Sequence, residues 1–364
     1  MVVSGIWPPD VGGPAVHAPE VAGFLRGRGH EVDVVITADR APEAETYPLH
    51  WTSRASPPGV RHLAGTRLVA ARARRADVVY ATGMFGRASL AARIARRPIV
   101  LKLVADPAFE RARRLGLWRG SLADFQSRPS LASLPLRAAR TSDARRAAHV
   151  VTPSSFLREL VLGWGVPPDH VTVLPNPAPE VPELPSREEL RGRFGIEGTT
   201  LVFAGRLAAQ KSLEVGIEAA KRAGVPLLVA GDGPERAALE ALGGARFLGP
   251  LSRRGVLELF RAGDAALLSS SWENFPHSVV EALAVGTPVI ATRTGGVAEV
   301  VRDGENGLLV EPGDPGALAE AIRRFVDDPE LAGRLRLRAA PSVGGYAVER
   351  IYGRLEEILL EAAG

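Results

Sequence analysis

The chain has 364 residues, too many for one ordinary hydrophobic core, so we expect two domains of similar size. Apolar residues make up 46% of it and charged residues 24%, which excludes a mainly disordered protein. It contains no cysteine, which excludes disulfides, thiolate zinc sites and a cysteine nucleophile and fits a reducing compartment. No apolar run approaches the roughly 20 residues that span a bilayer. No secretory signal follows Met1, so we expect a cytoplasmic protein.

Positive charge is concentrated in the first half of the chain. Residues 1–180 carry 24 basic and 15 acidic side chains, whereas residues 181–364 carry 21 and 26. One interpretation is a solvated surface in an arginine-rich protein, and the other is a basic face that meets an anionic lipid or a phosphorylated substrate. We expect no nucleic-acid partner, because the basic half has few aromatic residues for base stacking and no known nucleic-acid module.

Short β-branched segments alternate with amphipathic segments along both halves. The first half predicts strands at Val2–Ile6, Val32–Thr37, Val78–Ala81, Ile99–Val104, Val150–Thr152 and Val171–Leu174. The second half predicts strands at Leu201–Ala204, Leu227–Ala230, Arg246–Leu248, Ala265–Leu268, Val289–Ala291 and Gly307–Val310. Helices are predicted between them, for example at Ala15–Arg28, Ser212–Arg222 and Pro315–Val326. This alternation is typical of parallel sheets covered on both faces, so we predict an α/β fold with two doubly wound domains.

A proline-rich segment separates the two halves. Pro175–Pro185 holds five prolines in eleven residues, which favours a stiff linker over a helix or an inner strand. We therefore expect a first domain of residues 1–178 and a second of residues 179–346. The amphipathic stretch Ala347–Ala363 either caps the second domain or crosses back onto the first.

Ligands of doubly wound sheets bind beyond the carboxyl ends of the strands. After the predicted strand at 201–204, Gly205 and Arg206 are followed by Lys211, just before a helix. Two cations beside the unpaired N–H groups of a helix N-terminus are suited to a diphosphate. The alternative is an exposed loop with two ordinary surface cations.

The loop after the predicted strand at 227–230 holds Gly231 and Gly233, and Pro234 is expected to begin the following helix. The two glycines permit a close approach of the backbone to a ligand. The loop is only superficially similar to a dinucleotide-binding motif, because Arg236 stands where the third glycine belongs. Binding of NAD is therefore not indicated.

The most distinctive segment runs from Ser269 to Ala284, after the predicted strand at 265–268. Pro276 is expected in the first turn of a helix, with Glu273 in the loop before it and Glu281 one to two turns inside. Carboxylates so placed can accept hydrogen bonds from a sugar and from a ribose diol. The alternative is that Glu273 only interacts favourably with the N-terminal end of the helix dipole and that Glu281 is solvated. It is weaker for Glu281, because the surrounding residues 279–284 are apolar and an unpartnered charge there is costly.

Glu273 and Glu281, with seven residues between them, resemble the E-x7-E motif of glycosyltransferase family 4, whose members are retaining enzymes with the GT-B fold. Further segments of the family follow in register at 205–211, 231–234, 286–291, 295–299 and 303–310. The resemblance implies two Rossmann-like domains facing a central cleft. It also implies that the first domain binds the acceptor and that the second binds a nucleotide-sugar donor.

The resemblance also implies roles for individual residues. Arg206 and Lys211 match the donor diphosphate clamp, Glu281 the ribose-binding carboxylate, and Glu273 the group that contacts the donor sugar. The backbone around Leu251 matches the segment that holds the base. The family's loop whose amides contact sugar hydroxyls corresponds to Asn274, Phe275, Pro276, His277 and Ser278. His277 departs from the Asn or small residue often found at its position, so the identity of the sugar stays open.

Two segments of the first half also match the family. The loop Pro8–Pro14 carries Gly12 and Gly13 and either approaches the donor or only reverses the chain. Asp106 stands where many members carry a His-Asp pair, but Ala105 occupies the histidine position. Asp106 therefore either binds the donor sugar or the acceptor, or caps the following helix. The expected catalytic set is Asp106, Arg206, Lys211 and Glu273.

These features predict a retaining glycosyltransferase that moves a sugar from a nucleotide-diphosphate sugar, UDP- or GDP-linked, to an acceptor hydroxyl. No Asp-x-Asp motif ends a strand, so we expect no metal and no other cofactor. The arginine-rich stretch from Arg87 to Arg146 suggests a saccharide acceptor that is anionic or lipid-linked, and peripheral membrane contact through Arg111, Arg113 and Arg114. The alternatives are a sugar-nucleotide 2-epimerase-like enzyme and a catalytically silent binding module.

Overall fold

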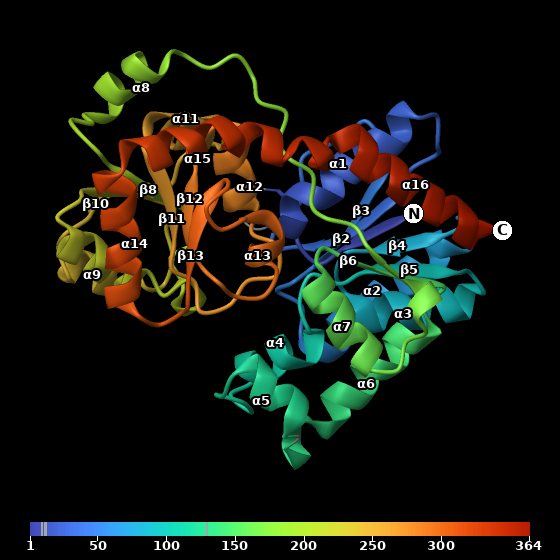
Figure 1. The fold of residues 1–364 in the computed structure, drawn as a ribbon. Coiled ribbons are helices and arrows are strands. Elements are labelled where there is room, and N and C mark those ends of the chain that lie inside the picture. The colour runs from blue at the N-terminus through green and yellow to red at the C-terminus, as the bar shows by residue number, and fades with distance from the viewer. Residues whose placement is uncertain (9, 11–12, 129) are drawn as a thin grey trace. The chain divides into compact units, whose positions relative to one another are not determined.

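The computed structural model of the chain describes residues 1–8, 10, 13–128 and 130–364. The chain forms two compact units (Figure 1). Unit 1 comprises Met1–Pro175 together with Ile351–Gly364, and unit 2 comprises Asn176–Arg350. Their boundaries thus follow residues 175 and 350, where the sequence pattern suggested 178 and 346.

Unit 1 is built on a parallel sheet of seven strands among the described residues, in the order β3-β2-β1-β4-β5-β6-β7. The strands are β1 (Val2–Ser4), β2 (Val34–Ala38), β3 (Leu49–Ser53), β4 (Val79–Ala81), β5 (Ile99–Lys102), β6 (His149–Thr152) and β7 (Val171–Val173). The α-helices are α1 (Gly13–Gly27), α2 (Pro58–Ala73), α3 (Phe85–Ala95), α4 (Pro107–Arg114), α5 (Leu122–Ser127), α6 (Leu134–Arg146), α7 (Ser155–Gly163) and the C-terminal α16 (Val348–Ala363), which begins at the end of unit 2. Two 3-10 turns, η1 (Leu131–Ser133) and η2 (Pro168–His170), complete the described elements.

Unit 2 repeats this plan with six parallel strands in the described chain, in the order β10-β9-β8-β11-β12-β13. They are β8 (Leu201–Ala204), β9 (Leu227–Ala230), β10 (Arg246–Gly249), β11 (Ala265–Leu268), β12 (Val289–Thr292) and β13 (Gly307–Val310). The α-helices are α8 (Arg187–Phe194), α9 (Leu213–Ala223), α10 (Arg236–Ala241), α11 (Arg253–Ala262), α12 (His277–Ala284), α13 (Val297–Val300), α14 (Pro315–Asp327) and α15 (Pro329–Ser342). The 3-10 turns are η3 (Ala209–Lys211) and η4 (Gly344–Tyr346). The predicted pair of doubly wound α/β domains is thereby confirmed.

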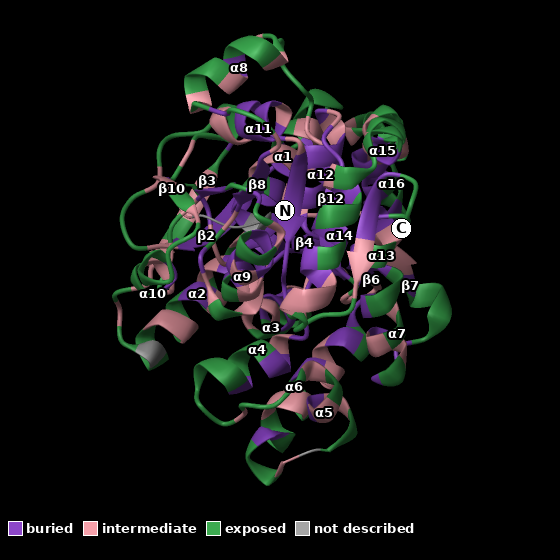
Figure 2. Cartoon of the chain, turned by 60° about the vertical axis from the view of Figure 1, so that its left-hand side comes forward, coloured by how far each residue is buried: buried purple, intermediate pink, exposed green. Residues whose placement is uncertain are grey.

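The strands form because their apolar side chains are buried on both faces of each sheet. In β8, Val202 packs into a cluster on one face, whereas Leu201 and Phe203 pack into a cluster on the other. All three are at most 1% exposed. Figure 2 shows the result, with buried strands inside each unit and exposed outer faces on the helices. The buried two-sided strands explain why the hydrophobic runs were continuous rather than alternating.

Two local predictions differ from the structure. The edge strand β3 was not predicted, because its sequence Leu-His-Trp-Thr-Ser alternates polar residues and its Trp51 is 38% exposed. Pro234 does not begin a helix. Instead α10 begins at Arg236, since the N–H of Glu235 donates to the carbonyl of Leu207 and holds the preceding turn against the β8 loop.

The C-terminal helix α16 makes its polar contacts with α1 and the turn after it. The Tyr352 hydroxyl donates to Glu20 Oε2 at 2.8 Å, and its ring contacts Phe24 edge-on. Glu356 lies 2.6 Å from His30 Nε2 and 3.1 Å from Arg28 Nε, and these two partners lower the pKa of its carboxyl. Residues 351–364 therefore belong to unit 1, although the chain reaches them from unit 2.

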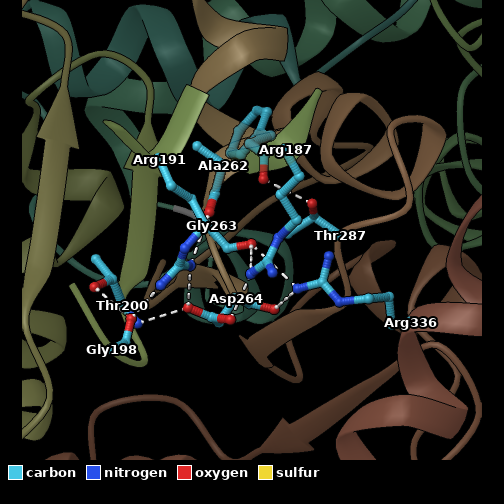
Figure 3. Close-up of polar contacts among 10 residues, drawn as sticks. Arg187, Arg191, Gly198, Thr200, Ala262, Gly263, Asp264, Thr287 and Arg336 are labelled. Atoms are coloured by element: carbon cyan, nitrogen blue, oxygen red, sulfur yellow. Dashed lines mark hydrogen bonds and ion pairs between the residues drawn. The ribbon is translucent and has the colours of Figure 1, made fainter. Parts of the chain in front are cut away.

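A charged cluster fastens helix α8 to unit 2 (Figure 3). Asp264 accepts hydrogen bonds from Arg187 Nη2 at 2.5 Å, from Arg191 Nη1 at 3.0 Å and from the Thr200 N–H at 2.9 Å. Arg336 donates to the Asp264 carbonyl at 2.9 Å, and burial beside Arg187 lowers its pKa to about 10. The single carboxylate of Asp264, just before β11, thus offsets the positive charge of several guanidinium groups.

Replacing Asp264 with Asn is expected to lower the free energy of unfolding by about 2 kcal/mol, because it removes the anion that these partly buried donors share. Urea unfolding measures the change. Glu218→Gln, which breaks a surface pair with Arg222, is the control and is expected to cost less than about 1 kcal/mol. Equal losses for the two variants would contradict the assignment.

Lys102 is a buried cation at the end of β5. It is 1% exposed, its Nζ donates to the carbonyl of Leu174 at 2.9 Å, and burial lowers its pKa to about 7. The unfolded chain, with the ordinary value of 10.5, therefore binds more protons between about pH 7 and pH 10.5. The contribution of this group to stability accordingly rises as the pH rises through that window.

Lys102→Met removes this titration. The melting temperature of the variant relative to the wild type is expected to be higher near pH 7 than near pH 10, since only the wild type gains stability as its lysine deprotonates in the fold. Thermal unfolding at both pH values measures the difference. A pH-independent difference would show that Lys102 is not titrating as its burial requires.

Candidate functional site

The predicted site of unit 2 lies where its strand order reverses. β8 and β11 are neighbours in the sheet, but the chain proceeds from β8 to β9 on one side and from β11 to β12 on the other. The loops that follow β8 and β11 therefore leave the carboxyl edge in opposite directions, which is where doubly wound sheets bind ligands. Gly205, Arg206 and Lys211 follow β8, and the segment 269–276 follows β11.

Hydrogen bonds join these two loops into one cradle. Ser269 Oγ donates to the Lys211 carbonyl at 3.1 Å, and the Ser271 N–H donates to the Gln210 carbonyl at 2.9 Å. Gln210 Nε2 in turn donates to the Trp272 carbonyl at 2.9 Å. The turn η3 is thus fixed against the loop that carries the first glutamate of the motif.

Lys211 and Glu273 form an ion pair in this cradle. Lys211 Nζ contacts Glu273 Oε1, and the Ser270 hydroxyl donates to the same oxygen at 2.9 Å. The side chains are 18% and 8% exposed, respectively. The two residues were predicted separately, one for a diphosphate and one for a sugar, and the structure places them in direct contact. Arg206 stands on the same loop with an exposed side chain.

The two glycines after β9 lie against the backbone of the β8 loop. Gly231 has a φ of +131°, and a Cβ placed on it would lie 1.9 Å from the carbonyl oxygen of Gly205. A Cβ on Gly233 would lie 2.2 Å from the carbonyl oxygen of Leu207. The close approach is therefore to the backbone of the β8 loop, and it sets the position of Arg206 between these contacts.

The segment around helix α12 combines core and surface positions. Phe275 is 5% exposed and its ring contacts Tyr346, so this side chain belongs to the hydrophobic core. Asn274 and Pro276 are buried, and Pro276 stands immediately before α12 rather than in its first turn. The partly exposed positions of the predicted site here are His277, Ser278, Glu281 and, after β10, Leu251.

In unit 1, Gly12 lies outside the described residues and Gly13 is the first residue of α1. Asp106, at the start of α4, is 1% exposed. Its Oδ1 accepts from the N–H groups of Ala108 and Phe109 at 2.8 and 3.2 Å, and its Oδ2 accepts from Gln126 and Arg140. Of the two roles left open for Asp106, the structure shows the helix cap, because both carboxylate oxygens are already bound. Its predicted place among the catalytic residues stays a prediction.

Sequence reasoning missed Ser270 and Gln210, which hold Glu273 and the Ser269 loop. The run of three serines directly after β11 was the available signal for the first of them. Among the described residues, no group of three acidic or histidine side chains could hold a metal ion. Likewise, no described helix is long and apolar enough to cross a membrane.

Glu273→Gln is expected to lower the free energy of unfolding by about 2 kcal/mol, because it leaves the half-buried Lys211 without its counter-charge. The double variant with Lys211→Met is expected to regain part of that loss, since it removes both charges together. Urea unfolding of the single and double variants measures the coupling. Strictly additive losses would contradict a stabilising pair.

Comparisons with known proteins give the family of the chain. Residues 186–340 match the family "Glycosyl transferases group 1", and residues 12–177 match "Glycosyl transferase 4-like domain". The chain is 36% identical over 168 residues to the alpha-D-kanosaminyltransferase of Streptomyces kanamyceticus, a match that covers 43% of this chain and 44% of that protein. It is 32% identical over 233 residues to the D-inositol 3-phosphate glycosyltransferase of Acidothermus cellulolyticus, covering 56% and 52%. The matches thus span about half the length of these curated relatives.

The fold is also that of a solved structure over its full length. The Anabaena protein HepE in complex with UDP-glucose superposes with a TM-score of 0.79 and 21% sequence identity, covering 99% of both chains. Two family matches that together cover both units, and a shared GT-B fold, give the same result. The chain belongs to the group 1 glycosyltransferases of family 4.

Proposed function

We propose that this chain is a retaining glycosyltransferase that moves a sugar from a nucleotide-diphosphate sugar to an acceptor hydroxyl. The observation that carries the proposal is the Lys211–Glu273 pair at the switch point of unit 2, with Arg206 on the same loop. Family membership supports the reaction class. In this proposal, unit 2 binds the donor and unit 1 binds the acceptor.

The leaving group of this reaction is a nucleoside diphosphate, and its negative charge grows as the anomeric C–O bond breaks. Arg206 and Lys211 supply fixed positive charge for it, so the stabilisation is aimed at the transition state. Because the cations are side chains, we propose that transfer needs no metal. The N–H groups of His277 and Ser278, at the start of α12, would donate to hydroxyls of the donor sugar.

Glu273 and Glu281 are the proposed hydrogen-bond acceptors of the site. Glu273 is held by Lys211 and Ser270, so one oxygen is fixed and the carboxylate keeps its orientation for a sugar hydroxyl. Glu281, half-buried on α12, would accept from the ribose diol, and the backbone near Leu251 would hold the base. Since Asp106 is bound on both oxygens, we propose front-side attack by the acceptor hydroxyl rather than a covalent intermediate on that residue.

The donor is proposed to be a UDP- or GDP-sugar. The complex of HepE with UDP-glucose supports UDP, because its fold aligns with the whole of this chain. The acceptor is proposed to be a saccharide, lipid-linked or free, or another small molecule that meets the basic unit 1. The basic residues Arg111, Arg113 and Arg114 on α4 would give a cytoplasmic protein a peripheral contact with an anionic membrane.

A thermal-shift series with UDP-, GDP- and ADP-sugars tests the donor site. One of the first two is expected to raise the melting temperature of the wild type, and Arg206→Gln is expected to weaken that binding about tenfold or more, because it removes a charge-assisted contact with the diphosphate. Arg222→Gln, a surface arginine on α9 in the same unit, is the matched control.

Sugar transfer is then measured with and without a chelator. Undiminished turnover in chelator agrees with side chains as the only source of positive charge for the leaving diphosphate. No response to any nucleotide sugar, or a strict requirement for a divalent ion, would contradict the proposed function.

A further inference from the structure

Arg87 is a half-buried arginine at the carboxyl edge of the unit 1 sheet. It stands in the first turn of α3, directly after the loop that follows β4. Its guanidinium lies over α2, where a Cβ placed on Gly65 would come within 3.0 Å of Nη1. Nη1 is buried and has no hydrogen-bond partner among the residues that the structure describes. A buried donor without an acceptor costs free energy, so this position calls for an explanation.

The charges that act on Arg87 are also positive. Burial lowers the pKa of its guanidinium, and Arg61 on α2 and Arg111 on α4 lower it further. Arg61 and Arg111, on two other helices, are thus near enough for their charges to act on Arg87. Residues 51–150, which include all three, hold 20 basic and only 5 acidic side chains. We name Arg61, Arg87 and Arg111 the arginine triad.

Other arginines of unit 1 differ from Arg87 because their guanidinium groups have acceptors, although Arg54 Nε and Arg140 Nε are also buried without a partner among the described residues. Arg140 pairs with Asp106 at 2.6 Å, and Arg54 pairs with Asp10 and Asp39. Arg137 donates to the carbonyls of Phe125 and Gln126. These side chains stabilise the fold, whereas Arg87 repels its neighbours. An arginine that does not contribute to folding in this way is suited to a ligand.

The triad also lies beside the switch point of unit 1. β1 and β4 are neighbours there, and the chain leaves them in opposite directions. A Cβ placed on Gly83, in the loop before α3, would lie 2.6 Å from the Gly5 nitrogen after β1, so the two loops are in close contact. Arg61 is linked to the same edge, because its Nη1 donates to the carbonyl of Arg54, the partner of Asp10.

We propose that the arginine triad binds a phosphate group carried by the acceptor. The inference rests on the proposed function, in which unit 1 receives the acceptor. A phosphate monoester presents three oxygens and up to two negative charges, and guanidinium groups from three helices would bind it with charge-assisted, bidentate hydrogen bonds. The phosphate would accept hydrogen bonds from the Arg87 guanidinium and would neutralise the repulsion among the three cations. The group could come from a soluble phosphorylated compound or from a lipid headgroup, which share this chemistry.

Thermal unfolding of the full chain in inorganic phosphate, at constant ionic strength, tests the triad. Phosphate is expected to raise the melting temperature of the wild type, and Arg87→Gln is expected to weaken its apparent affinity about tenfold or more. Without phosphate, Arg87→Gln is expected to melt above the wild type, because it removes a buried, repelled charge. A merely structural arginine would give the opposite sign.

Two controls make the result specific. Arg67→Gln, an exposed arginine on α2, removes the same charge and is expected to keep the phosphate response. Arg206→Gln is expected to keep the phosphate response and to lose the nucleotide-sugar response, so failure of the donor site is distinguishable from failure of the triad. An undiminished phosphate response in Arg87→Gln, or an equal loss in Arg67→Gln, would overturn the proposal.

Binding to phosphatidylcholine vesicles with and without phosphatidic acid distinguishes the two sources. If Arg87→Gln loses the response to inorganic phosphate but binds acidic vesicles as the wild type does, the triad binds a soluble phosphorylated acceptor. If it loses both the phosphate response and the vesicle binding, the triad binds a phosphate in a lipid headgroup. Loss of vesicle binding alone would overturn a phosphate-specific site.

Discussion

The ion pair between Lys211 and Glu273 is the interaction on which the site of unit 2 depends. It joins the loop after β8 to the loop after β11, which the topology of the sheet sends in opposite directions. Ser270 holds the carboxylate, and the backbone contacts of Gln210 and Ser269 hold the two loops together. Loss of either partner would leave the other charge uncompensated in a partly buried place. The same pair then offers a cation to a diphosphate and an anion to a sugar hydroxyl.

The two units use arginine in different ways. In unit 2, Arg187, Arg191 and Arg336 converge on Asp264 and the carbonyls beside it, and the cluster fastens α8 before β11. In unit 1, Arg54 and Arg140 pair with carboxylates although the Nε of each is buried without a partner, whereas Arg87 has a buried Nη1 and no ion pair among the described residues. Arginines that pair with a carboxylate therefore contribute to stability, and Arg87 is the better candidate for recognition of an anion.

Much of the fold could be predicted from the sequence, because buried parallel strands leave continuous apolar runs. The predicted strands and helices agree with the observed ones to within two residues at each end. β3 was missed because an edge strand is solvated on one side and therefore lacks that signal. For the site, the sequence supplied Lys211 and Glu273 but not their pairing, since residues 62 positions apart meet only through the order of the strands. The reason for Gly231 was likewise hidden, because the backbone that it approaches belongs to another loop.

A crystal structure with a bound nucleoside diphosphate would show directly whether the loops after β8 and β11 hold the donor. We expect the diphosphate to lie against Arg206 and Lys211 and the ribose to reach Glu281. Glu273 is expected to stay beside Ser270, with its other oxygen toward the sugar position. A diphosphate bound away from the loops that follow β8 and β11, or a ribose remote from α12, would contradict it.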